Sequence, residues 1–95
     1  MPAKGPAVPL SEKFKALSDT RRRQVLELLL EGPHAAGDIA ARFDITAATV
    51  SHHLSQLKKA GLVRVTRSGT FLYYELEPDA FVEVKDWIQR MEGVQ

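Results

Sequence analysis

The spacing of the apolar residues changes twice along the chain, and this change limits the folds that the chain can adopt. Up to Gly61 the apolar residues recur every three or four positions, which is typical of helices. Residues 62–76, LVRVTRSGTFLYYEL, are instead rich in valine, threonine and aromatic residues around Ser68-Gly69, and they predict a β-hairpin with its tip at that dipeptide. The helical spacing then returns at Phe81. We therefore expect a mainly helical fold with one small hairpin.

Two helices are predicted before the first turn signals. A short one carries Leu10, Phe14 and Leu17 at helical spacing and ends at Ser18-Asp19, residues that favour helix caps. The second spans about 20–31 and ends at Gly32-Pro33. We expect it to be the central buried helix because it is apolar nearly all round, at Val25, Leu26, Leu28, Leu29 and Leu30.

Three further helices complete the predicted order α-α-α-α-β-β-α. AAGDIAARF (35–43) forms a short helix with Ile39, Ala40 and Phe43 inward, and Asp44-Ile45 makes a tight turn. Thr46 is an expected N-cap for a fourth helix, 46–60, which ends at Gly61. The last helix can begin at Pro78 and repeats its apolar residues at Phe81, Val84, Ile88 and Met91.

Length and composition indicate one small soluble domain, residues 10–92, preceded by a flexible arm, 1–9. The arm holds three prolines and no apolar run, which is unlike a secretion signal. No apolar run approaches the roughly 20 residues of a membrane-spanning helix, so we expect no membrane insertion and a cytoplasmic location. The chain has no cysteine, which excludes disulfides and thiolate metal sites.

The net charge of +1 conceals an uneven distribution. Residues 46–74 hold four basic residues, Lys58, Lys59, Arg64 and Arg67, and no acidic one, whereas 75–95 hold six acidic and two basic residues. Such a run can be simply a solvated face, or it can face an anionic partner. Three more arginines, 21–23, open the second helix, where the helix dipole disfavours cations; solvent exposure and phosphate contact are both open for them.

Two adjacent histidines lie in the fourth helix, and their helical positions separate their roles. Val50, Leu54 and Leu57 share one stripe, which we expect to be buried. His53 borders that stripe, whereas His52 lies nearly opposite it. Neighbours on a helix do not face one another, so the pair should not chelate a metal. We expect His53 to pack by its ring and His52 to face a ligand.

A short helix, a tight turn and a second helix that starts with small polar residues are typical of a helix-turn-helix, whose second helix enters the DNA major groove. Small residues permit close approach, and Ser, Thr and His can bond base edges or phosphates. Helix 46–60 is thus the expected recognition helix, and the hairpin that follows, which is free of acidic residues up to Tyr74, strengthens this prediction. The expected DNA-binding residues are Thr46, Ala47, Ala48, Thr49, Ser51, His52, Gln56, Lys58, Lys59, Arg67 and Thr70.

Three segments, FKALSDTRRRQVLELL, AGDIAARFDITAATVSHHLSQLKKAGLV and RSGTFLYYEL, resemble the ArsR-type (arsenic-repressor) family of bacterial winged-helix repressors. The resemblance covers about residues 10–91, and its specific part is TVSHHLxxLKxAGLV followed by GxxxYYxL. It is strongest to the small autorepressor branch without metal ligands. It implies a repressor that binds a palindromic operator in double-stranded DNA as a homodimer, with recognition helices in successive major grooves. It also implies that hairpin 62–76 is a wing on the flanking backbone or minor groove.

The resemblance also implies where two copies join, namely through the first and last helices. A chain this short buries only about 60–65% of the surface its unfolded form exposes, so a partner subunit would help it. Trp87 with Phe14 and Leu10 could form either core within the chain or the dimer seam, and we favour the seam. The expected interface residues are Leu10, Phe14, Leu17, Phe81, Val84, Trp87, Ile88 and Met91.

Metal-sensing members of the family carry a cysteine pair where this chain has AAGD, or Asp and His ligands on the last helix, where this chain has no histidine. We therefore expect no metal and no cofactor. Regulation would then come from protein level, a sequestering protein or an unidentified small molecule. No nucleophile, base and acid fall together, so we do not expect an enzyme. The alternative function is a winged-helix module that binds protein without DNA specificity.

Overall fold

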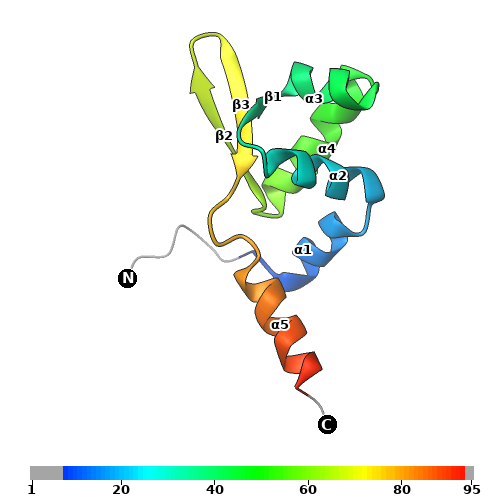
Figure 1. Cartoon of the computed structure of the whole chain (residues 1–95), viewed down its shortest axis with the longest axis vertical. Coiled ribbons are helices and arrows are strands. Elements are labelled where there is room, and N and C mark those ends of the chain that lie inside the picture. Colours follow the sequence, from blue (N-terminus) through cyan, green and yellow to red (C-terminus); the bar gives the residue numbers. More distant parts are fainter. Residues whose placement is uncertain (1–7, 94–95) are drawn as a thin grey trace.

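The structure is a computed structural model that describes residues 8–93, in which five helices and a three-stranded sheet form one body (Figure 1). The elements follow in the order α1 (Leu10–Leu17), α2 (Thr20–Leu29), β1 (His34–Ala35), α3 (Ala36–Phe43), α4 (Ala47–Lys59), β2 (Val63–Ser68), β3 (Phe71–Leu76) and α5 (Val82–Glu92). This order confirms the predicted winged helix-turn-helix, with one strand added.

The added strand, β1, pairs with the outer edge of β3 in the sheet order β1-β3-β2. His34 lies opposite Tyr74 and Ala35 opposite Tyr73, both in antiparallel register. Two residues are too few for a periodic signal, so only the pairing with β3 identifies this strand. It fixes the start of α3 against the base of the wing.

The wing is the antiparallel pair β2 and β3, with Val63 opposite Leu76 and Ser68 opposite Phe71. The loop is therefore Gly69-Thr70, one residue later than the predicted tip at Ser68-Gly69. Gly69 has φ +62°, the left-handed value that a two-residue hairpin loop needs at its first position. Of the two adjacent tyrosines, Tyr74 packs against the core.

Side-chain caps begin α2 and α4, and left-handed residues follow α3 and α4. The Asp19 carboxylate accepts a hydrogen bond from the Arg22 backbone N–H at the start of α2, and the Thr46 hydroxyl accepts one from the Thr49 N–H at the start of α4. Asp44 (φ 52°) ends α3 and begins the turn to α4. Gly61 (φ 75°) follows α4, and a side chain there would also meet Val8.

The core lies between α2, α4 and the base of the wing. Ile39, Val50, Leu54, Leu57 and Leu62 are among its largest fully buried side chains. Helix α2 contributes four buried residues, Val25, Leu26, Leu28 and Leu29, as expected for the central helix. Leu30, predicted to be buried with them, is instead exposed at the C-cap of α2.

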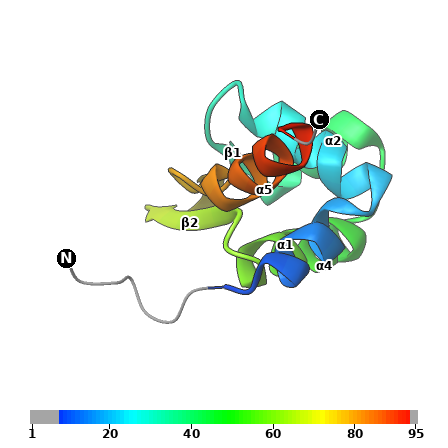
Figure 2. The same ribbon diagram turned by 90° about the horizontal axis from the view of Figure 1, so that it is seen from below.

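Helix α5 begins at Val82, four residues after the predicted start at Pro78. Residues 78–81 form turns, in which Asp79 has φ 64° and the Ala80 N–H donates to the Glu77 carbonyl. The buried Lys13 of α1 anchors this segment, because its Nζ donates to the Ala80 carbonyl at 2.8 Å. From there α5 extends away from the sheet to the lower end of the view in Figure 1, and α1 packs against α5. Figure 2 shows the molecule from that end, with α5 in front.

Most of the predicted N-terminal arm, 1–9, lies outside the described residues. Of its last two residues, Val8 is half-buried beside Gly61, and the Pro9 carbonyl accepts a hydrogen bond from the Glu12 N–H. Among residues 8–93, no helix is long and apolar enough to cross a membrane.

Candidate nucleic-acid interface

Helix α4 divides into a buried stripe and an outer polar face, as its sequence predicts. Val50, Leu54 and Leu57 are 0–1% exposed. The predicted DNA-binding positions at the start of the helix are all exposed: Thr46, Ala47, Ala48, Thr49, Ser51 and His52. The hydroxyls of Thr46 and Thr49 lie 2.8 Å apart, so both residues form the cap as well as the surface. The outer face therefore presents small side chains at its N-terminal end.

The two histidines separate as predicted. His52 is exposed, whereas the His53 side chain is only 12% exposed. The His53 Nδ1 is buried without a hydrogen-bond partner, and it lies 3.9 Å from the Asp19 carboxylate. Burial lowers the pKa of His53, and nearby Asp19 only partly opposes that shift. His53 thus belongs to the packing between α4 and the start of α2.

The wing supplies fewer unpaired cations than the sequence suggested. Arg64 pairs with two glutamates. Its Nε lies 3.0 Å from Glu75 of β3, and its Nη1 lies 3.9 Å from Glu77, which directly follows β3. Arg67 and Thr70 are exposed near the wing tip, and Arg67 makes no ion pair within residues 8–93. Lys58 and Lys59 are exposed at the C-terminal end of α4. Arg67 and these two lysines therefore carry the positive charge of this surface.

The arginines that open α2 have intramolecular partners, which the sequence did not reveal. Arg22 donates from Nε to the Ala16 carbonyl at 2.8 Å and from Nη2 to the Lys15 carbonyl at 3.2 Å. Arg23 donates to the Leu17 carbonyl at 2.6 Å. Cations at these carbonyls compensate the negative end of the α1 dipole. Arg21 lies 5.3 Å from the centre of the Phe43 ring. Arg22 and Arg23 therefore connect α2 to the end of α1, and Arg21 packs on the last residue of α3.

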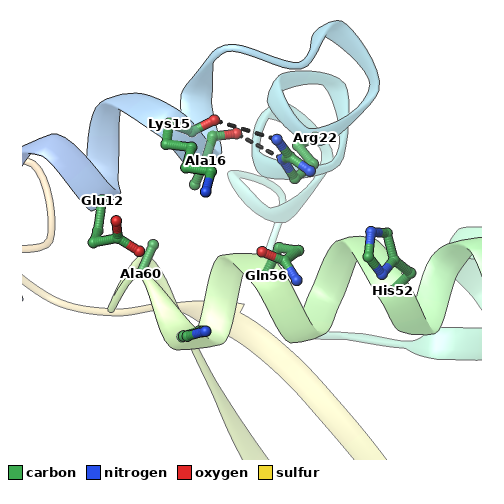
Figure 3. A pocket seen from close by; sticks show the side chains of 8 residues that line it. Glu12, Lys15, Ala16, Arg22, His52, Gln56 and Ala60 are labelled. Atoms are coloured by element: carbon green, nitrogen blue, oxygen red, sulfur yellow. Dashed lines mark hydrogen bonds between the residues drawn. The ribbon is translucent and has the colours of Figure 1, made fainter.

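A cavity of about 240 Å³ lies between α1, the start of α2 and α4 (Figure 3). In the figure, Lys15 and Ala16 of α1 stand across the cavity from Gln56 and His52 of α4. Gln56, one of the predicted DNA-binding residues, is half-buried in this wall because its position on α4 turns it toward α1. The lining residues are Glu12, Lys15, Ala16, Arg22, His52, Gln56, Lys59 and Ala60.

The expected dimer residues fall into three groups by burial. Val84 is buried, and Leu10, Phe14, Leu17 and Phe81 are half-buried, with Leu17 and Phe81 packed against the core. Trp87 meets Phe14 edge-on within the chain, with ring centres 5.3 Å apart, yet it stays 38% exposed. Ile88 and Met91 are exposed on the same side of α5. Helix α5 thus presents an apolar stripe to solvent.

Potential metal ligands do not cluster in the part of the chain that the structure describes, where no group of three or more His, Asp or Glu side chains could hold an ion.

Comparisons with known proteins agree with this geometry. A family model described as "Bacterial regulatory protein, arsR family" matches residues 19–65. The "Transcriptional repressor SdpR" of Bacillus subtilis is 40% identical over 79 residues, which cover 83% of this chain and 88% of that protein.

Solved structures share the fold. The crystal structure of an ArsR family transcriptional regulator has a TM-score of 0.79 at 29% identity and covers 87% of this chain and 86% of its own. A solution structure from Mycobacterium bovis, titled as a homodimeric winged helix-turn-helix DNA-binding domain, has a TM-score of 0.73 at 32% identity and covers 87% of this chain and 77% of its own. This chain therefore belongs to the arsR family of bacterial regulatory proteins.

Proposed function

We propose that this protein represses transcription by binding a palindromic DNA operator as a homodimer, with α4 in the major groove and the wing on the flanking backbone. The observation that carries the proposal is the outer face of α4. Its N-terminal half exposes Ala48, Ser51 and His52, and α4 has no acidic residue that would repel phosphates. The SdpR relative is named as a repressor, which agrees with this function.

Two observations support a homodimer: the recognition helix of one chain is short, and α5 exposes apolar residues. A single helix of 13 residues reads only a few base pairs, so specific binding needs two half-sites. The stripe of Trp87, Ile88 and Met91 offers apolar surface that a second copy would cover. The Mycobacterium bovis relative is described as a homodimer.

Protein–protein binding by the same winged helix is the rival function, and salt dependence separates the two. DNA binding releases counterions from phosphates, so the logarithm of the association constant should fall steeply with the logarithm of salt concentration. A protein partner would not impose that slope. The exposed Lys58, Lys59 and Arg67 favour the DNA function.

The deciding experiment is selection from a randomised duplex pool followed by footprinting. We expect one palindromic sequence with two protected half-sites about 34–36 Å apart between centres. Enrichment of no sequence, or protection of one half-site by a monomer, would overturn the proposal. Footprinting of the DNA upstream of the protein's own gene then tests autorepression separately.

Location and regulation complete the proposal. We place the protein in the cytoplasm, where the DNA is, and we assign it no catalytic role. We infer that release from DNA does not use a metal, because the sequence has no thiolate ligand and α5 carries no histidine. Release would instead follow from protein level, a sequestering protein or a small molecule.

A further inference from the structure

The cavity between α1 and α4 carries more positive than negative charge. Lys15 and Lys59 are cationic, and neither makes an ion pair within residues 8–93. Arg22 adds a third cation, although two of its nitrogens already bind the carbonyls of α1 (Figure 3). Glu12 is the one carboxylate in the lining. Such a lining favours an anion that brings its own hydrogen-bond acceptors.

The position of the cavity favours an anion that belongs to the docked duplex. His52 and Lys59 belong both to the outer face of α4 and to the cavity lining. Glu12, Lys15, His52 and Lys59 are all exposed, whereas sites for small molecules bury most of the ligand. When α4 enters the major groove, the phosphates that border the groove pass along the edges of this helix, and the cavity lies at one of those edges.

The cavity would stay accessible in the proposed dimer. On a helix that advances 100° per residue, Lys15 lies about 100° or more around α1 from each member of the apolar stripe, Leu10, Phe14 and Leu17. That stripe packs toward the core and Trp87. The face of α1 used for subunit contact is therefore separate from the face that lines the cavity.

We propose that this cavity is a phosphate seat for the DNA backbone, in which Lys15 of α1 and Lys59 of α4 are the two cations that contact the phosphate. The inference rests on the proposed function and extends the DNA interface to α1, where no DNA-binding residue was predicted. Arg22 of α2 holds the C-terminal end of α1 in place through its bonds to the Lys15 and Ala16 carbonyls. Lys15 thus positions the duplex without reading its sequence.

The first test compares Lys15→Gln with Arg90→Gln on α5, which loses the same charge away from α4. Both variants should keep the circular dichroism spectrum and dimeric state of the wild type. Lys15→Gln should remove one phosphate contact per subunit, which is two per dimer. The slope of log association constant against log salt concentration should therefore become less negative by about 1.8. If affinities converge near 1 M salt, this corresponds to a Kd roughly 60-fold higher at 0.1 M. Arg90→Gln should keep the wild-type slope.

The second test locates the contact by replacing single backbone phosphates of the selected duplex with neutral methylphosphonates. One position per half-site should weaken the wild type but have no further effect on Lys15→Gln. If every position has the same effect on both proteins, or if Lys15→Gln keeps the wild-type slope, the phosphate seat is wrong while the proposed function stands. A wild type that binds no duplex would overturn the proposed function itself.

Discussion

Replacing His53 with alanine should destabilise the fold and leave DNA discrimination intact, whereas the same change at His52 should do the reverse. The His53 ring is 12% exposed, so its removal leaves a space at the junction of α4 and α2. Loss of a buried ring costs about 2–4 kcal/mol. The change also removes a buried nitrogen without a hydrogen bond, which offsets about 1–2 kcal/mol.

The net cost at His53 therefore falls within about 0–3 kcal/mol, with a central value of about 1.5 kcal/mol. For a chain of 95 residues the central value lowers Tm by roughly 6–12 °C, because each kcal/mol shifts Tm by about 4–8 °C in small domains. His52→Ala should change the free energy of unfolding by less than about 0.5 kcal/mol. It should weaken operator binding by about 1–3 kcal/mol and relax preference at one base pair per half-site.

Thermal unfolding and binding titrations on both variants check this pair. The assignment fails if His53→Ala loses sequence discrimination at an unchanged Tm, or if His52→Ala unfolds at a much lower temperature. Either result would mean that α4 is rotated about its axis relative to the packing described above.

The same histidine predicts a pH dependence of stability. Burial lowers the pKa of His53 in the folded state, so the unfolded state binds the proton more readily. Its contribution to stability should be present above the ordinary value of about 6.5 and be lost as pH falls below it. The pKa of Asp19 is lowered chiefly by the hydrogen bond from the Arg22 N–H. Asp19 therefore changes the pH dependence of stability only below its ordinary pKa of 3.8. From about pH 7.5 to about pH 5.5, the Tm of the wild type should therefore fall by more than the Tm of His53→Ala. Equal falls in Tm would contradict the burial of His53.

Arg67→Ala, at the wing, should weaken binding to all sequences alike and flatten the salt slope by about one unit per subunit; an unchanged slope would remove the wing from the interface. Arg22→Ala should lower the free energy of unfolding by about 1.5–3 kcal/mol, because two carbonyls of α1 lose a charged donor; a Tm equal to that of wild type in thermal unfolding would refute this. Ile88→Asp, on the exposed stripe of α5, should give a folded monomer in sedimentation that no longer protects two half-sites, and a dimer of unchanged affinity would exclude this stripe from the interface.

Local patterns in the sequence determined most of the elements and the phase of α4. Apolar spacing places Val50 and Leu57 on one side of the helix, and it separates His52 from His53 without reference to any other element. The caps at Asp19 and Thr46 are equally local, since each side chain bonds a backbone N–H three residues ahead. These features need only neighbours along the chain, so the sequence was enough to predict them.

Only the tertiary structure decided which charged and polar groups are paired. The arginines of α2 bind carbonyls six or seven residues earlier, and Arg64 meets Glu75 across the hairpin, so the sequence overstated the cations available to DNA. Strand β1 exists through its pairing with β3. Lys13 is buried because the Ala80 carbonyl, 67 residues away, accepts its hydrogen bond. Each of these depends on a partner that folding brings from elsewhere in the chain, and the periodicity of a segment carries no information about that partner.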